Sequence, residues 1–211
     1  MYNVKTKIIA TLGPSSNTQT IISSMIEKGM DVARINMSHF NTIQDFESII
    51  KIIRSEAKKQ LKHVGILADL AGPKIRLDLH HLKNEILKIQ KGKIYKLGFS
   101  KDCDIKINAN ITFKENNNID EFFVKIDDGK VIFKVVDRQI NSLSLEAQSD
   151  ATLYNKKGVN FPGIQLNIPP LTVKDKEHIK LALKNNIDWL ALSFVRESSD
   201  IKPIIDIFKK E

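Results

Sequence analysis

Cysteine is nearly missing from this chain of 211 residues, which contains only Cys103. A single thiol cannot build an internal disulfide framework or a cysteine-rich zinc site. Such sparing use of cysteine is typical of proteins in a reducing cytosol. We therefore expect a cytoplasmic protein.

Long hydrophobic runs are also missing, because no apolar stretch approaches the roughly 18 residues that a membrane-spanning helix needs. Residues 1–7 lead directly into a short strand pattern, without the apolar core of a signal peptide. The sequence predicts neither membrane insertion nor export.

A dense basic run is the third absence, although the formal net charge is +8. The charge is +5 in residues 1–76, +2 in residues 77–160 and +1 in residues 161–211, so the lysines are dispersed. Basic residues are not interleaved with aromatic ones, and we expect no nucleic-acid partner. Attraction of small phosphorylated substrates stays open.

Proline is absent from residues 77–160, and all six prolines lie outside this segment. Within the segment apolar and polar residues alternate with a period of two, and Asp128-Gly129 has the sequence of a hairpin turn. This pattern predicts an all-β domain inserted between stiffer connections.

Strand and helix patterns alternate on both sides of that segment. We expect strands at residues 5–12, 31–37, 64–68 and 189–195, the last one buried, and a final helix at residues 199–210. Thr42 with Asp45, and Thr172 with Asp175, have the spacing of capping boxes at helix starts. Such alternation is typical of parallel strands joined by helical crossovers, which is an α/β fold.

Polar residues follow one face of the second expected strand, at Arg34, Asn36 and Ser38. Unpaired polar groups are costly to bury, so this pattern indicates a ligand or an ion, unless the strand is a solvent-facing edge. Asp69 closes the third strand, and Lys74 and Arg76 leave one face of the extended segment that follows it. The alternative for this second group is an ordinary strand end with solvated charges.

Five segments resemble the pyruvate kinase family in their order and spacing: Thr6-Lys-Ile-Ile-Ala-Thr-Leu-Gly-Pro-Ser-Ser16, Val32-Ala-Arg-Ile-Asn-Met-Ser-His39, Asp69-Leu-Ala-Gly-Pro-Lys-Ile-Arg76, Lys156-Lys-Gly-Val-Asn160 and Ser193-Phe-Val-Arg196. The family fold is a (β/α)8 TIM barrel with a mobile β-domain inserted after the third strand. The resemblance therefore implies a partial barrel of about four βα units. Residues 1–76 begin it, residues 77–160 form the inserted lid, and residues 161–211 resume the barrel before its fifth strand.

The resemblance also implies roles for individual residues. Arg34 matches the residue that holds the substrate phosphate, and Arg34, Lys74 and Arg76 form the expected catalytic group. The expected nucleotide-binding residues are Asn36, His39, Arg76 and Lys157. The family's monovalent-cation site matches Asn36, Ser38, Asp69 and Leu70. For Lys157 alone, a solvated loop is the alternative.

Lys74 departs from the family, because many relatives have Glu at this position and use potassium. Leu70 replaces a frequent Thr and removes a hydroxyl. An ammonium on a flexible stem can supply one positive charge near Asp69, as potassium would. We expect that potassium is not required.

The implied glycolytic reaction moves a phosphoryl group from phosphoenolpyruvate to ADP, giving pyruvate and ATP. It calls for Mg2+, whose family ligands are expected beyond Glu211, so activity of these 211 residues alone is doubtful. A homo-oligomer is expected, since the full-length family forms tetramers. Two alternatives stay open: a noncatalytic half-barrel that binds phosphate or nucleotide, and an unrelated phosphate-binding or nucleic-acid protein.

Overall fold

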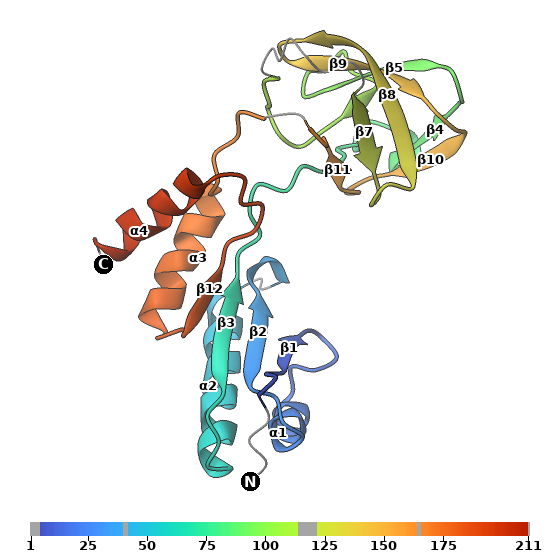
Figure 1. Cartoon of the computed structure of the whole chain (residues 1–211). Helices are drawn as coiled ribbons and strands as arrows, with labels where there is room; N and C mark the ends of the chain where they lie inside the picture. Colours follow the sequence, from blue (N-terminus) through green and yellow to red (C-terminus); the bar gives the residue numbers. More distant parts are fainter. Residues whose placement is uncertain (1–4, 40–41, 114–121, 164–165, 211) are drawn as a thin grey trace. The chain divides into compact units, whose positions relative to one another are not determined.

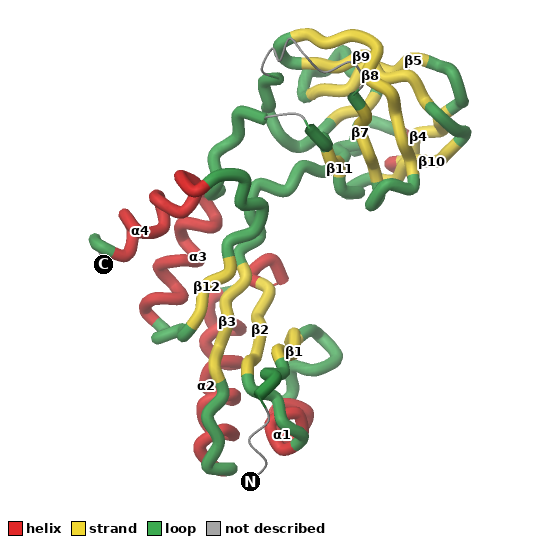
Figure 2. Tube along the Cα trace, viewed as in Figure 1, coloured by secondary structure: helices red, strands yellow, loops and turns green. Residues whose placement is uncertain are grey.

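The chain forms two compact units in a computed structural model that describes residues 5–39, 42–113, 122–163 and 166–210. One unit combines Met1–Pro73 with Pro170–Glu211 and is α/β (Figure 1). The other unit, Lys74–Pro169, contains strands and a single short 3-10 turn among its described residues (Figure 2). No helix in the described ranges has the length and apolar character needed to cross a membrane.

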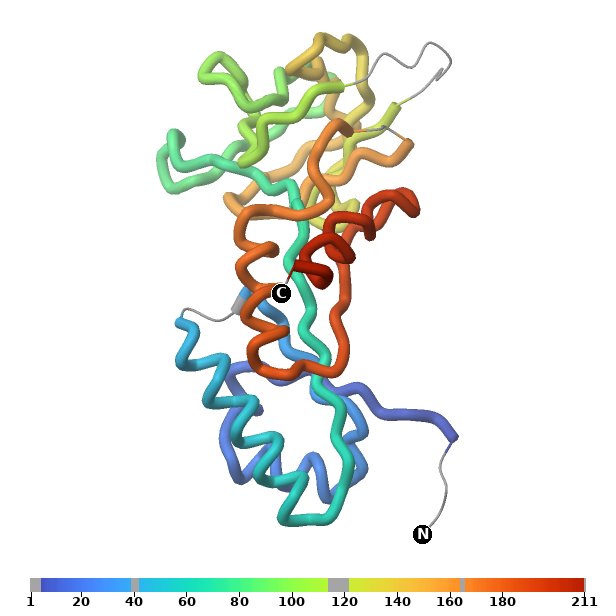
Figure 3. Tube along the Cα trace, turned by 90° about the vertical axis from the view of Figure 1, so that its left-hand side faces the viewer, coloured from blue at the N-terminus to red at the C-terminus, as the bar shows by residue number. Residues whose placement is uncertain are grey.

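Four parallel strands form the sheet of the α/β unit, in the order β1 (Ile9–Leu12), β2 (Val32–Asn36), β3 (Gly65–Asp69) and β12 (Trp189–Ala191). The helices are α1 (Gln19–Glu27), α2 (Ile43–Lys59), α3 (Val173–Lys184) and α4 (Lys202–Phe208). Figure 3 shows α3 in orange beside α4 in red. The helices and one face of the sheet share a single apolar core, which includes Ile35, Ile66, Ile22, Phe46 and Ile179. The opposite face of the sheet carries Thr11, Arg34, Asn36 and Asp69 toward the carboxyl ends of the strands, and apolar side chains such as Val32 and Leu67 lie beside them on the same face.

The all-β unit consists of β4 (Ile86–Ile89), β5 (Ile94–Gly98), β6 (Ile105–Lys106), β7 (Phe123–Ile126), β8 (Val131–Gln139), β9 (Ser142–Ala147), β10 (Ala151–Tyr154) and β11 (Val159–Asn160). Six strands join in the order β11-β7-β8-β9-β5-β6, and β10 pairs separately with β4. The 3-10 turn η2 (Lys83–Glu85) precedes β4. The apolar core of the all-β unit is separate from that of the α/β unit and centres on Leu97, Phe133 and Leu145. The expected turn at Asp128-Gly129 joins β7 to β8.

The boundaries of the all-β unit lie at residues 73/74 and 169/170, whereas the sequence pattern suggested 76/77 and 160/161. Ile75 and Phe161 are both buried in the core of the all-β unit, which draws the flanking segments into it. The sequence pattern could not place these two residues in the all-β unit, because each is a single apolar residue outside the regular strands and does not change the periodicity.

The last strand is shorter than expected and is not buried. β12 ends at Ala191, and Trp189, Phe194 and Val195 are 62%, 47% and 51% exposed, so the prediction of a buried strand through residue 195 is wrong. Among the described strands, β12 pairs with β3 alone, and no described strand pairs with its other edge. β1 is likewise shorter than expected and has Ile9 exposed at the opposite edge.

The helix starts follow the sequence closely. Thr172 and Asp175 form the reciprocal capping box of α3, and the Thr42 hydroxyl accepts the N–H of Asp45 at the start of α2. The final helix begins at Lys202 after the 3-10 turn η3 (Ser198–Ile201), and Pro203 lies in its first turn, where no backbone donor is missed.

Asp175 also ties α3 to the sheet. Its Oδ2 accepts hydrogen bonds from the N–H and the hydroxyl of Thr172 at 2.9 and 2.6 Å, and its Oδ1 accepts the N–H of Gly72 at 3.3 Å. The carboxylate is fully buried. Removing it would leave these donors without an acceptor inside the protein.

We therefore expect Asp175→Ala to lower the free energy of unfolding by about 1–3 kcal/mol. Asp45→Ala is the matched control, because Asp45 occupies the same position in α2 but is exposed, and its loss should stay below about 1 kcal/mol. Urea unfolding followed by helical circular dichroism measures both losses, since all four described α-helices belong to the α/β unit. Equal, small losses would contradict the structural role of Asp175.

Candidate active site

An ion pair between Arg34 and Asp69 joins two neighbouring strands of the α/β unit. The strands are parallel with Asn36 opposite Asp69, so the Arg34 side chain can extend along β3 to its carboxyl end. Arg34 Nε donates to Asp69 Oδ2 at 3.0 Å, and Arg34 Nη2 pairs with the same oxygen. The Asp69 side chain is only 14% exposed, which makes its attraction to the guanidinium stronger than that of a fully solvated pair.

The two outer strands complete this arrangement. Arg34 Nη1 donates to the Thr11 hydroxyl on β1 at 2.7 Å, and the Ser193 hydroxyl, just after β12, donates to Asp69 Oδ1 at 3.4 Å. We call Thr11, Arg34, Asp69 and Ser193 the strand-end cluster. Each strand of the sheet supplies or leads into one member, and catalytic residues of barrel enzymes likewise come from the ends of several strands.

The guanidinium of Arg34 keeps bonding capacity for a ligand. It has five N–H donors, and the described contacts with Asp69 and Thr11 engage its three nitrogens without using every hydrogen. Its side chain is 37% exposed. A planar cation that is fixed on one side and open on the other suits a phosphate or carboxylate, which it can bind through two oxygens.

The Gly72 turn keeps Ser193 close to Asp69. Gly72 has a φ of +66°, and a Cβ at this position would lie 2.8 Å from Phe194 Cδ2 and 3.1 Å from the Ser193 carbonyl oxygen. Any other residue would push these two segments apart. The glycine after the third strand therefore has a packing role beside the cluster.

Asn36 and Ser38 lie next to each other but not on one strand face. β2 ends at Asn36, and Ser38 is in the 3-10 turn η1 (Met37–His39), so the expectation of three polar residues along one strand is wrong for Ser38. The turn forms because Asn36 Oδ1 accepts the Ser38 N–H at 3.0 Å, which replaces a strand hydrogen bond. The side chain of His39 lies outside the described part of the structure.

Leu70 cannot offer a side-chain ligand. It is 1% exposed, packs into the apolar core, and donates its N–H to the Ala191 carbonyl at 3.0 Å. Its backbone carbonyl is the one group left for a cation. Among the described residues there is no group of three or more His, Cys, Asp or Glu side chains that could hold a metal ion.

The other expected site residues belong to the all-β unit. The segment containing Lys74 and Arg76 runs antiparallel to the segment containing Lys157, with Arg76 opposite Gly158. Arg76 Nη1 donates to the Lys156 carbonyl at 2.8 Å, and Lys74 Cε lies 3.6 Å from the point where a Cβ on Gly158 would be. Ile75 and Leu77 are buried, so Lys74 and Arg76 do alternate with core residues as the sequence suggested.

The whole chain matches one family model, that of the pyruvate kinase barrel domain, over residues 3–211. It is 35% identical to a pyruvate kinase of Staphylococcus epidermidis over 214 residues and 33% identical to those of Staphylococcus haemolyticus and Staphylococcus aureus over 211 residues. The chain belongs to the pyruvate kinase family. Each of these alignments covers 98% of this chain and 36% of the relative, so the chain spans about a third of the length of these pyruvate kinases.

Three residues to which the sequence alone assigned no role contact the expected site residues. Thr11 and Ser193 stand inside two of the family-like segments, and their hydroxyls proved to contact Arg34 and Asp69. Asp127 directly precedes the hairpin turn at Asp128-Gly129, and its carboxylate pairs with Lys157 at 3.0 Å. Hydroxyls at strand ends could have been suspected from their alternation with apolar neighbours, whereas the Asp127 contact joins residues 30 positions apart and has no local signal.

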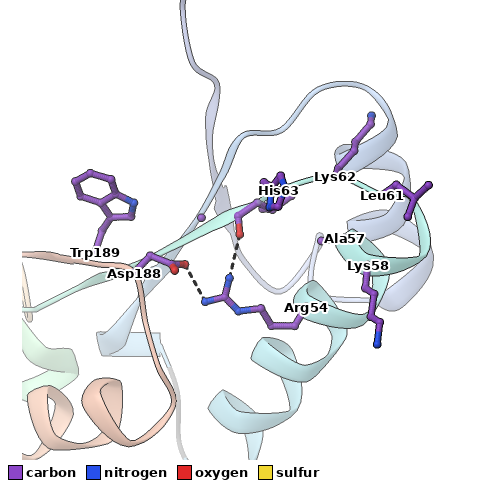
Figure 4. A pocket seen from close by; sticks show the side chains of 10 residues that line it. Arg54, Ala57, Lys58, Leu61, Lys62, His63, Asp188 and Trp189 are labelled. Carbon is purple, nitrogen blue, oxygen red and sulfur yellow. Dashed lines mark hydrogen bonds and ion pairs between the residues drawn. The ribbon is translucent and has the colours of Figure 1, made fainter. Parts of the chain in front are cut away.

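A hollow of about 800 Å3 lies at the amino-terminal ends of β3 and β12, away from the strand-end cluster. Figure 4 shows Arg54 reaching across it to Asp188, with Trp189 on one side and Leu61 on the other. Arg54 donates to Asp188 Oδ2 at 2.8 Å and to the carbonyls of Asn186 and Val64. No residue expected to act in pyruvate kinase chemistry lines this hollow, and barrel enzymes use the opposite end of their strands.

Proposed function

We propose that this protein acts as a pyruvate kinase, transferring the phosphoryl group of phosphoenolpyruvate to ADP. The observation that carries the proposal is the Arg34 guanidinium, held by Asp69 and Thr11 at the strand ends of a chain that matches the family along its length. Phosphoryl transfer needs positioning and charge neutralisation more than covalent chemistry. A fixed cation that remains open to an anion fits this demand.

In this proposal the α/β unit is the first four βα units of the (β/α)8 barrel, and the all-β unit is the family's inserted lid domain. Arg34 binds the phosphate of phosphoenolpyruvate, while Arg76 and Lys157 bind the phosphates of the nucleotide. Asn36 and His39 lie beside the nucleotide. Two compact units with separate cores support this division, because each can keep its own packing when a lid closes.

The proposed monovalent-cation site consists of Asn36, Ser38, Asp69 and the backbone of Leu70, and Lys74 replaces the cation. Oxygen atoms of an amide, a hydroxyl and a carboxylate suit a hard cation, but the buried leucine side chain supplies nothing to it. Because Leu70 supplies no side-chain ligand to a metal cation, we expect the Lys74 ammonium to provide the positive charge instead. The Mg2+ that stabilises the transferring phosphoryl group would be held by carboxylates outside residues 1–211.

We further propose a cytoplasmic homo-oligomer. The competing function is a noncatalytic module that binds phosphate or nucleotide, which the open side of the Arg34 guanidinium would serve equally well. Both functions use Arg34 and Lys157 for anions, and they differ in turnover.

Turnover separates the two functions. The isolated 211-residue chain should convert phosphoenolpyruvate and ADP no faster than the background rate. Co-expressed with the part of the Staphylococcus epidermidis enzyme that it does not match, it should form pyruvate with Mg2+ at on the order of 10 per second. The relative's own matching segment, joined with the same part, is the positive control. If that control is active and the complemented chain is not, the module is the better account.

Lys74 has its own test in the complemented enzyme. The complemented enzyme with the natural Lys74 should form pyruvate without potassium, because the ammonium supplies the positive charge. The Lys74→Glu variant should form pyruvate only when potassium is present. Pyruvate formation is measured in sodium-free buffer with and without potassium. A wild-type rate that rises tenfold or more on adding potassium, equal to about 1.4 kcal/mol of transition-state stabilisation, would show that Lys74 is no substitute.

A further inference from the structure

The turn between β7 and β8 contacts the segment that carries Lys157, within the all-β unit (Figure 1). The Asp127 N–H donates to the Gly158 carbonyl at 3.0 Å, next to the pairing of β7 with β11. Asp127 thus has its backbone fixed against the residue that follows Lys157.

The charge of Asp127 is not needed for the turn itself. Asp127 has a φ of 53°, a left-handed conformation that asparagine adopts as readily as aspartate. An amide would therefore serve the backbone equally well. The carboxylate is explained instead by two ammonium groups, Lys157 at 3.0 Å and Lys130 at 3.1 Å.

These two lysines hold the carboxylate ionised. Hydrogen bonds from Lys157 first, and from Lys130 second, lower the pKa of Asp127 below its ordinary value. The Asp127 side chain is 21% exposed and that of Lys157 is 40% exposed, so an incoming anion can reach Lys157. Such an anion meets a lysine that is already paired with a carboxylate.

We propose that Asp127 is the counter-ion of Lys157 in the unliganded protein, and that the phosphates of a nucleotide must displace it to bind Lys157. The inference rests on the proposed function, which gives Lys157 its ligand. Lys130 makes the exchange possible, because Asp127 keeps one cationic partner when Lys157 leaves. Asp127 is thus a positioning residue that sets how tightly the nucleotide binds.

Substitutions of the two partners should change ADP affinity in opposite directions. Asp127→Asn keeps the turn and removes the competing charge, so ADP should bind two- to fivefold more tightly. Lys130→Gln leaves Asp127 dependent on Lys157, so ADP should bind two- to fivefold more weakly. A merely structural role of Asp127 would weaken binding in both variants.

Titration calorimetry of the 211-residue chain with ADP measures these affinities. Asp102→Asn is the matched control, because Asp102 is a carboxylate of the same unit that is paired with a different lysine, Lys96, and its loss should leave ADP affinity unchanged. The effect of Lys130→Gln should disappear when Asp127 is already Asn. Persistence of that effect would mean that Lys130 acts on ADP directly.

Lys157→Ala distinguishes failure of the inference from failure of the proposed function. If ADP affinity is unchanged in Lys157→Ala, Lys157 does not bind the nucleotide. The nucleotide-binding role of Lys157 in the proposed function is then wrong, and so is the counter-ion role of Asp127. If Lys157→Ala weakens ADP binding but Asp127→Asn does not strengthen it, Lys157 binds nucleotide and the counter-ion inference alone is wrong.

Discussion

The ion pair of Arg34 with Asp69 is the interaction on which the rest of the candidate site depends. It needs β2 and β3 in parallel register, because only then does a side chain in the middle of β2 meet the last residue of β3. That register needs the apolar face of the same strands, where Ile35 and Ile66 pack under the helices. The core thus fixes the register of the strands, and this register determines where Arg34 and Asp69 meet on the opposite face.

The pair also explains why a charge can be partly buried here without a ligand. Burying a lone guanidinium or carboxylate would cost several kcal/mol, which is comparable to the net free energy of unfolding of a whole domain. The pairing of Arg34 with Asp69 offsets part of that cost for both groups, and Thr11 and Ser193 satisfy further hydrogen-bonding positions. An anion that enters the site meets a cation already held in place, so little rotamer entropy is lost on binding.

Much of this architecture could be predicted from the sequence. The strand and helix alternation, the capping box of Thr172 and Asp175, and the hairpin turn at Asp128-Gly129 are local patterns, and all of them are present. The exposed stretch at Phe194 and Val195 could not be predicted, because burial of an apolar run depends on a neighbouring strand rather than on the run itself. Ser38 was misplaced for a different reason: the Asn36 side chain accepts the Ser38 N–H, and the strand ends at Asn36, one residue before the pattern predicts.

Contacts between distant residues were the least predictable. The sequence named Arg34, Asp69 and Lys157 but not the partners that orient them, and these partners come from other strands or from a turn. A hydroxyl or a carboxylate in such a position reads locally as a turn former or as surface. The residue types predict a site that binds anions, which stays a prediction, and only the fold supplies the geometry of Arg34 and Asp69.

The most direct measurement of the central claim is the nuclear magnetic resonance signal of the Arg34 Nε–H during titration with phosphoenolpyruvate. The account predicts a saturable shift of that signal in the 211-residue chain, and at least about tenfold weaker binding in Arg34→Lys, because an ammonium cannot reproduce the planar contact with Asp69 and phosphate. An Arg34 signal that stays unmoved while phosphoenolpyruvate binds, or equal affinity in Arg34→Lys, would contradict it.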